Sequence, residues 1–314
     1  MDAPRPATEA SVPDLEELLL WVRRELVLRD EAPSGTWVEE SARDLKVGRK
    51  PGWYLPPAGG GGLAFYQPRG AQAYGHVHVG VGPDARGRAH RLADRLLDTL
   101  PPEIRSIDVG FTGLAADGER ELLEAMAVRP GSTLIARRAM ERALAAGDGA
   151  PLAPLPGGLV YLPVRRVTLD ALADLDLRAF SGSTDALLAG PTVADYRRVL
   201  ESVLGGQFGR FLDEASTAVY RAEPPQLVGA LLTTELSARR AVFVDFMVDP
   251  ASRRQGLGRG LLRWGLRALW ALGYERVRLW VTDANTAART LYETSGFRVT
   301  ATASIYRWDR PVPK

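Results

Sequence analysis

The sequence predicts an α+β protein made of two tandem copies of one domain. Strand-like alternation and helical spacing of apolar residues follow one another in both halves of the chain, in the same order. A length of 314 residues also exceeds the usual size of one domain. Hydrophobic residues make up 46% of the chain and charged residues 25%, which excludes a disordered or membrane-embedded class.

The second half has the clearer pattern. A glycine-rich turn opens a long apolar helix, and Gly273 follows it in the position that a helix-ending glycine favours. Thr192 is the expected N-cap of an earlier helix. The predicted elements are a strand over 160–167, helices over 170–180 and 193–204, strands over 216–221, 227–236 and 241–248, the helix over 256–272, a strand over 277–281, a helix over 286–294, and a final pair of strands over 297–308.

The first half repeats this order more weakly. The stretch from Val77 to Pro83 precedes a turn and a helix as Phe243 to Pro250 does, so Pro83 corresponds to Pro250. Residues 106–111, 119–126 and 133–139 then correspond to the next strand, the short helix and the last strand of the second half. Pro56 to Gly62 predicts a loop between two strands.

A segment without helical or strand periodicity separates the two halves. Ala145 to Gly158 reads AAGDGAPLAPLPGG, a composition typical of a linker. We therefore expect a first domain over residues 1–146, a linker over 147–158 and a second domain over 159–314.

Charge and cysteine content limit the possible partners. The net charge is +2 and the arginines are dispersed, so a nucleic-acid surface is not expected. The chain has no cysteine, which excludes disulfides, thiolate nucleophiles and thiolate metal sites. The N-terminus resembles no secretory leader and no apolar stretch is long enough to span a bilayer, so we expect a cytoplasmic protein without a membrane partner.

The turn around Gly256 and Gly258 is the strongest candidate for a binding site. Glycines between a strand and a helix let successive backbone N–H groups point outward, and the helix start adds positive potential, so a pyrophosphate is the favoured ligand. The turn lacks the Gly-Lys-Ser/Thr ending of a P-loop, and Gly260 comes one residue too early for a dinucleotide fingerprint. The glycines could instead serve only close packing of the helix on the strand.

Two ordered motifs give a more specific resemblance. The stretch 248–262, VDPASRRQGLGRGLL, resembles the acyl-CoA-binding motif of the GNAT acetyltransferase superfamily. Asn285, then Leu291-Tyr292-Glu293 and Gly296-Phe297, resembles the second signature of that family. The resemblance implies two tandem GNAT-like domains, each with a mixed, mostly antiparallel twisted sheet flanked by helices. The tandem layout is also similar to that of the mycothiol synthases, although no motif carries over their substrate.

The resemblance also implies roles for individual residues. The strand 241–248 would splay from the strand 277–281, and acetyl-CoA, as co-substrate, would enter the gap. Backbone groups near Met247 and Val248 would hold the pantetheine arm, Asn285 would contact the pantetheine or phosphate region, and Tyr292 would protonate the leaving thiolate. The pyrophosphate site would comprise Arg253, Arg254, Gln255, Gly256, Leu257, Gly258, Arg259 and Gly260.

The general base is not marked by a family residue. The two positions where the family often has a glutamate hold Val242 and Trp280. Asp245 and Glu235 lie nearby among apolar neighbours, and either would have a raised pKa if buried. A structural carboxylate at Asp245, an exposed Glu235 and a water chain as proton acceptor are the alternatives. The stretch from Phe180 to Gly190 lies where the fold has a loop that covers the acceptor.

The first copy is expected to be degenerate. Ala89 and Arg91 occupy its two glycine positions, and Leu123 stands where the second copy has Tyr292. His76 and His78 alternate on one strand, but no third ligand is near, so we expect histidines at the surface or in a cleft and no metal site.

The sequence therefore predicts an enzyme that transfers an acetyl group from acetyl-CoA to a primary amine of a small molecule or a protein N-terminus. The alternative is a non-catalytic acyl-CoA-binding or regulatory module, which the missing family glutamate favours. A nucleotide-dependent oxidoreductase is excluded by the glycine spacing.

Overall fold

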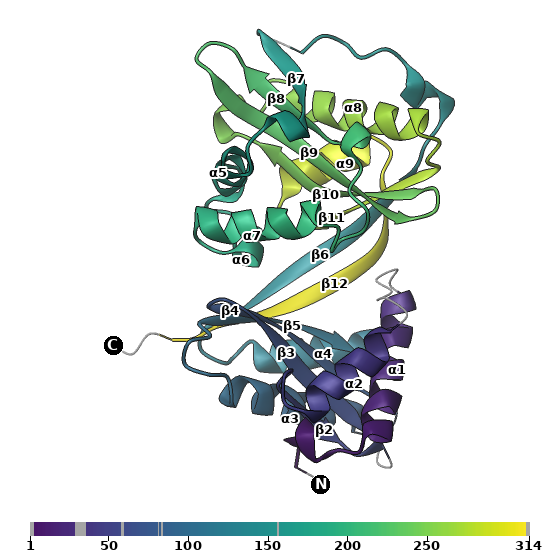
Figure 1. The fold of residues 1–314 in the computed structure, drawn as a ribbon, viewed down its shortest axis with the longest axis vertical. Coiled ribbons are helices and arrows are strands. Elements are labelled where there is room, and N and C mark those ends of the chain that lie inside the picture. Colours follow the sequence, from purple (N-terminus) through teal and green to yellow (C-terminus); the bar gives the residue numbers. More distant parts are fainter. Residues whose placement is uncertain are drawn as a thin grey trace. The chain divides into compact units, whose positions relative to one another are not determined.

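The computed structural model describes residues 3–28, 36–57, 60–80, 82, 84–155 and 157–311 (Figure 1). The chain forms two compact units. The first comprises Met1–Ile135 with Ser304–Lys314, and the second comprises Ala136–Ala303. The chain therefore leaves the first unit within one strand and returns to it within another.

The first unit is a mixed sheet with helices on both faces. Its strand order is β1-β2-β3-β4-β5-β12, in which β4 and β5 are parallel and the other described pairs are antiparallel. The elements are β1 (Arg5–Pro6), α1 (Val12–Leu28), α2 (Trp37–Lys46), β2 (Gly52–Leu55), β3 (Gly62–Arg69), β4 (Gln72–Val79), α3 (Ala85–Asp98), β5 (Ser106–Thr112), α4 (Ala116–Met126) and the start of β6 (Ser132–Ala143). Helices α3 and α4 cover one apolar cluster, and α1 and α2 cover another.

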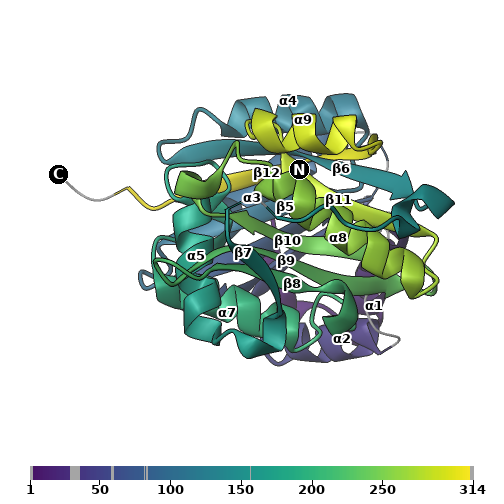
Figure 2. The same ribbon diagram turned by 90° about the horizontal axis from the view of Figure 1, so that it is seen from above.

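The second unit repeats this plan. Its strand order is β6-β11-β10-β9-β8-β7, in which β10 and β11 are the parallel pair. The elements are β7 (Leu159–Pro163), α5 (Leu169–Phe180), α6 (Ala186–Ala189), α7 (Val193–Leu204), β8 (Thr217–Arg221), β9 (Gln226–Ser237), β10 (Arg240–Val248), α8 (Leu257–Ala271), β11 (Arg276–Thr282), α9 (Thr286–Thr294) and β12 (Arg298–Asp309). Helices α8 and α9 cover one face and α5 and α7 the other; Figure 2 shows α9 and α7 on opposite sides of β9 and β10.

Most predicted elements of the second half are confirmed. Helices α7 and α9 have the predicted bounds, and the Thr192 side chain accepts a hydrogen bond from the Asp195 N–H as an N-cap. Two predictions were wrong. The first strand ends at Pro163 and continues as a 3₁₀ turn, and residues 298–309 form the single strand β12 instead of a pair.

The repeat is visible as two matching β-α-β-α motifs, β4-α3-β5-α4 in the first unit and β10-α8-β11-α9 in the second. The strand that follows each motif in the chain does not join the sheet that the repeat predicts. Strand β6 pairs along β11 from Arg137↔Thr282 to Ala143↔Arg276, in the second unit. Strand β12 pairs with β5 from Tyr306↔Val109 to Asp309↔Ser106, in the first unit. Each copy is thus completed by the last strand of the other.

This exchange moves the division between the units away from the segment 147–158. The division falls inside β6, because β6 supplies an edge partner to β11. The described residues of the proline-rich segment pack on the second unit. The Asp148 carboxylate is 2.6 Å from an Arg142 guanidinium nitrogen, and Leu155 lies against α8 at Gly260. In the described part of the chain, no helix is long and apolar enough to cross a bilayer.

The strand exchange gives a stability prediction for Tyr306. This side chain is fully buried in the first unit, and its hydroxyl lies 2.5 Å from Ser132 Oγ. Tyr306→Ala should cost about 3–5 kcal/mol of unfolding free energy, because a large buried ring leaves a cavity. Val299→Ala on the exposed part of the same strand should change it by less than about 0.5 kcal/mol. Denaturant unfolding measures both, and equal effects would contradict the role of β12 in the first core.

Candidate functional site

The parallel pair of the second unit opens partway along its length. Strands β10 and β11 pair from Arg240↔Arg276 to Phe243↔Leu279, but β10 continues to Val248 and β11 to Thr282. A β-bulge in the β9–β10 ladder leaves Val244 without a partner at the same point. Residues 245–248 remain paired with β9, while no pairing of them with β11 is described. The predicted splay is therefore present, and one edge of β10 is open to an extended ligand.

The turn between β10 and α8 presents unused backbone donors. Arg254 (φ +60°) and Gly256 (φ +84°) adopt left-handed conformations immediately before the helix. Among the described residues, nothing accepts a hydrogen bond from the backbone N–H groups of residues 254–259. Six successive donors at the positive end of a 15-residue helix fit the requirements of a pyrophosphate site.

The three glycines of the turn have different surroundings. A Cβ at Gly256 would meet no atom within 4 Å, whereas a Cβ at Gly258 would be in ordinary contact with Leu291 at 3.4 Å. At Gly260 a Cβ would lie 2.9 Å from Leu155, and the Gly260 N–H donates to the Gly256 carbonyl. Gly260 therefore serves packing, which corrects its expected place among the phosphate ligands. Leu257 is buried in the core and offers only its N–H.

The charged and amide side chains of the turn differ in whether they hydrogen-bond within the protein. The Arg253 guanidinium donates to the Val248 carbonyl at 3.3 Å and to the Ala179 carbonyl, so it holds the end of β10 against the end of α5. The Gln255 amide donates to the Ala251 carbonyl at 3.1 Å. Arg254 and Arg259 are exposed, and neither makes an ion pair with a described residue. Among the described residues, these two are therefore the unpaired positive side chains of the turn, while Arg253 has a structural role.

Met247 and Val248 lie on the open stretch of β10. The Met247 side chain packs under α5 and α7, and that of Val248 packs toward α8. The Val248 carbonyl already accepts from Arg253. What these two residues can offer a ligand is therefore main chain, as the family resemblance implies.

Tyr292 lies at the opening between the strands. Its ring meets that of Phe246 edge-on, with centroids 6.0 Å apart, and it is 5% exposed. No described residue hydrogen-bonds the hydroxyl. Burial, and then the charges of Asp185 and Asp245, raise the pKa of Tyr292, so the phenol keeps its proton at neutral pH.

Asp245 is paired with a carboxyl that the sequence did not single out. Asp176 on α5 is 2% exposed and shares a hydrogen bond with Asp245. Burial raises the pKa of Asp245 to about 6, and burial together with the Asp245 charge raises the pKa of Asp176 well above its usual range. The two carboxyl groups therefore titrate as a coupled pair. An aspartate on the apolar face of a helix was the available signal for Asp176.

Asp185 lies in the stretch from Phe180 to Gly190, which was expected to cover the acceptor. Its carboxylate accepts from the Thr282 hydroxyl and from the Asn285 amide, the latter at 3.1 Å. Asn285 also caps α9, because its Oδ1 accepts from the Ala288 N–H at 3.2 Å. The Asn285 side chain thus ties Asp185 to the end of β11, a use that differs from the expected contact with the cofactor.

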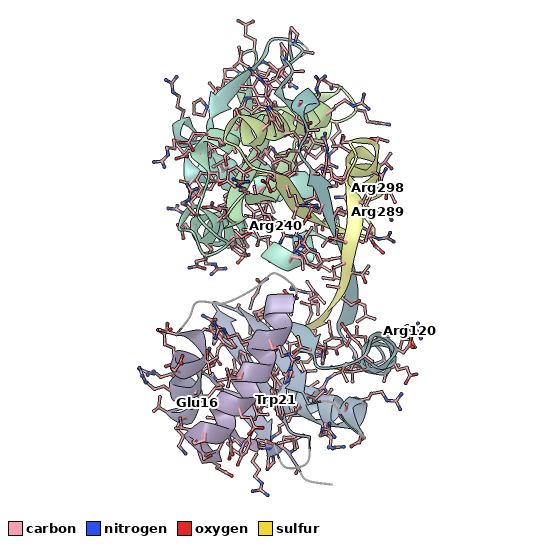
Figure 3. The ribbon with its side chains drawn as sticks, turned by 90° about the vertical axis from the view of Figure 1, so that its right-hand side faces the viewer. Glu16, Trp21, Arg120, Arg240, Arg289 and Arg298 are labelled. Carbon is pink, nitrogen blue, oxygen red and sulfur yellow. The ribbon has the colours of Figure 1, made fainter. Side chains whose placement is uncertain are left out.

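Glu235 lies away from the opening. It pairs in the ladder with Ala241, on the far side of the bulge, and forms a 2.7 Å ion pair with Arg210. That ion pair lowers the pKa of Glu235, and the partly exposed side chain does not meet the condition of burial on which a raised pKa was expected. Arg240 at the same end of β10, labelled in Figure 3, likewise donates to Glu141 at 2.7 Å. The charges at this end of the strand are structural.

The corresponding region of the first unit is closed. Strands β4 and β5 pair over seven residues, from Gln72↔Ser106 to His78↔Thr112, and have no splay. The His76 and His78 rings lie 3.0 and 2.8 Å from the Thr112 hydroxyl. Both histidines are buried, which corrects the expected surface or cleft position, and burial lowers the pKa of His78 to about 4.

In the first unit, the arginine side chains near the turn that corresponds to the Gly256 turn are bound by residues of the same unit. Arg91 pairs with Asp84 at 3.1 Å, and Arg88 donates to the Gly80 carbonyl at 2.8 Å. Leu123 is buried at the place of Tyr292. Within the described ranges, no cluster of three metal-ligating side chains is found in either unit. In the described part of the first copy, the parallel strands have no splay, Arg88 and Arg91 are bound within the unit, and Leu123 stands in place of Tyr292.

Two parallel strands that splay apart, followed by a turn with unused backbone N–H groups, define a class of fold that binds acyl-CoA. The family model described as Acetyltransferase (GNAT) family matches residues 183–297, which contain the splay, the turn and Tyr292. A mycothiol acetyltransferase from Gordonia bronchialis is 32% identical over 229 residues, which are 70% of this chain and 69% of that protein. The chain belongs to the GNAT acetyltransferase family.

Other matches are shorter or support the fold alone. A mycothiol acetyltransferase from Thermobispora bispora is 47% identical over 60 residues, and the matches to this and three similar relatives span only 16–20% of their lengths. A GCN5-related N-acetyltransferase from Sphaerobacter thermophilus superposes with a TM-score of 0.60 at 19% identity, over 96% of this chain and 95% of that one. A tandem GNAT protein of the clavulanic acid pathway gives 0.52 at 14% identity, over 99% of both chains.

The turn can be tested with two matched glycine variants. Gly256 and Gly273 both have left-handed φ and open space at Cβ, so Gly256→Ala and Gly273→Ala should each cost about 1–2 kcal/mol of stability. Only the Gly256 methyl would stand where phosphate oxygens approach the turn. Calorimetric titration with CoA should show at least about tenfold weaker binding for Gly256→Ala and unchanged binding for Gly273→Ala. Equal affinities would place the phosphates elsewhere.

Proposed function

We propose that the second unit transfers an acetyl group from acetyl-CoA to a primary amine of a small molecule or a protein N-terminus. The observation that carries this proposal is the open edge of β10 leading into the six unused N–H groups of the turn. Family membership supports the same reaction class.

The chain offers a place for each part of acetyl-CoA. The pyrophosphate binds the N–H groups of residues 254–259, with Arg254 and Arg259 as the nearby positive charges. The pantetheine arm extends along the open edge of β10 beside Asp245 to Val248. Main-chain donors of that edge polarise the thioester carbonyl, which stabilises the oxyanion that forms during attack.

Asp245 is the proposed proton acceptor. An amine with a pKa near 10.4 is less than about one part in a thousand neutral at pH 7, so a base beside it is useful. A carboxylate with a pKa of about 6 is ionised at pH 7 and is more basic than an ordinary aspartate. Asp176 orients Asp245 by a hydrogen bond between the two carboxyl groups.

Asp245, Tyr292 and solvent carry the proton transfers of the proposed reaction. Asp245 takes one proton from the ammonium group, and the neutral amine attacks the thioester carbon. The C–N bond forms, the C–S bond breaks, and its electron pair leaves on the CoA sulfur. Tyr292 gives its proton to that thiolate. The amine loses a second proton on forming the amide; one of the two protons restores Tyr292 through solvent, and the other is released.

Tyr292→Phe tests the acid. A thiol with a pKa near 8.5 is a tolerable leaving group, so the variant should lose about 10²-fold in kcat and retain some turnover. The assay is release of free CoA from acetyl-CoA over a panel of amines, including amines related to mycothiol because several relatives carry that name. Binding of CoA without release above background for any amine would favour the non-catalytic module.

The pH dependence tests the base. Asp245 must be ionised to accept a proton, so kcat/KM should fall about tenfold per unit as the pH drops below about 6. Asp245→Asn should remove that acidic limb and lower kcat/KM by about 10²-fold or more at pH 7. Glu235→Gln should leave the profile unchanged, since Glu235 is held by Arg210. An acidic limb that persists in Asp245→Asn assigns the base to another group.

A further inference from the structure

Three aspartates from separate segments meet where β10 and β11 diverge. Asp176 and Asp245 are hydrogen-bonded to each other, and Asp185 is fixed by Thr282 and Asn285 at the end of β11. The charges of Asp185 and Asp245 both act on the Tyr292 hydroxyl, so both carboxylates lie near this hydroxyl. The three carboxyl groups will be called the acidic cluster.

The acidic cluster differs from the other aspartates of the second unit. Asp148, Asp170, Asp174, Asp195, Asp213, Asp249 and Asp283 each form an ion pair with an arginine. Among the described residues, no lysine or arginine forms an ion pair with a member of the acidic cluster. In this arginine-rich chain, the three carboxyl groups of the acidic cluster thus have no arginine or lysine counter-ion among the described residues.

Tyr196 on α7 gives an independent indication of a ligand. The residue is 1% exposed, and its buried hydroxyl has no hydrogen-bond partner among the described residues. Tyr196 packs in the same apolar cluster as residues of α5 and β10, the elements that carry Asp176 and Asp245. Burial, and then the charges of Asp176, Asp245, Asp185 and Asp195, raise the pKa of Tyr196. Asp176 Oδ1 is likewise buried without a partner. Buried polar atoms without partners are costly, and a bound ligand that donates hydrogen bonds would satisfy them.

A ligand that meets these requirements carries positive charge and several N–H donors. An ammonium group has three donors and no acceptor, and it would neutralise part of the charge of the cluster. We infer that the acceptor is a cationic amine without a carboxylate next to the amine, and that its ammonium group binds between Asp185 and the Asp176–Asp245 pair. This inference rests on the proposed acetyl transfer and narrows its substrate class.

The charges of the acidic cluster also disfavour free α-amino acids as acceptors. In a free α-amino acid the carboxylate lies two bonds from the amine nitrogen, and the acidic cluster would repel it. Amides of amino acids, N-terminal residues of peptides, amino sugars and polyamines have no such carboxylate. The site therefore separates amines by the charge beside the nitrogen.

Matched pairs of acceptors test the inference. Glycine and glycinamide, L-alanine and L-alaninamide, and L-serine and L-serinamide differ in that charge and in the amine pKa that the charge raises, so kcat/KM is calculated for each on the concentration of the free amine. We expect kcat/KM to be at least about tenfold higher for each amide than for its acid. Asp185→Asn, which keeps an acceptor for the Asn285 amide, should reduce this preference severalfold, mainly through a higher KM for the amides. Glu201→Gln on α7, outside the acidic cluster, should leave it unchanged.

A binding measurement separates this inference from the proposed activity. Calorimetric titration of CoA into Asp185→Asn checks that the variant is folded and that the turn is intact. L-alaninamide and L-alanine are then titrated into CoA-saturated protein. If the protein binds the amide and Asp185→Asn weakens that binding severalfold, the inference is supported even without turnover. Absence of turnover would overturn only the proposed activity. Equal use or binding of acids and amides, or an unchanged preference in Asp185→Asn, overturns the inference.

Discussion

The opening of the β10–β11 ladder is the constraint on which the site depends. A sheet normally pairs every buried N–H and C=O, so a strand that leaves its neighbour must find other partners or bind a ligand. The bulge at Val244 produces this departure while β9 holds the other edge. Two arginines stabilise the open end: Arg253 donates to the Val248 and Ala179 carbonyls, and Arg178 is 2.9 Å from Asp249, whose other oxygen caps the turn.

The first unit shows what the same topology does without the opening. Its parallel strands β4 and β5 stay paired as far as Thr112, whose hydroxyl is hydrogen-bonded to two histidine rings. Near the turn that follows, Arg91 pairs with Asp84 and Arg88 donates to the Gly80 carbonyl. The Arg88 and Arg91 side chains of the first unit thus have partners within that unit, whereas Arg254 and Arg259 of the second make no ion pair with a described residue. The first copy also contributes β6, which completes the sheet of the second unit. Its retention in the chain thus has a structural basis independent of any ligand.

Charge is distributed unevenly although the net charge is only +2. Most arginines of the second unit are held by carboxylates or backbone carbonyls, and Arg254 and Arg259 are the exposed positive side chains of the turn without an ion pair to a described residue. On the face of α5 and α7, carboxyl groups gather without such partners. The two ends of the opening therefore suit ligands of opposite charge, an anionic diphosphate and a cationic amine.

The sequence by itself determined the elements of the second half, the tandem repeat, the turn and Tyr292. These depend on local periodicity and on glycines whose backbone conformations are fixed within a few residues. Only the tertiary structure decided the strand exchange, the pairing of Asp176 with Asp245 and the position of Asp185. β6 and β12 have the same alternation whichever sheet they join, and a carboxyl group on α5 has a shifted pKa only when β10 brings another beside it. Glu235 and Asp245 are only ten residues apart, yet Arg210 lowers the pKa of one and burial raises that of the other.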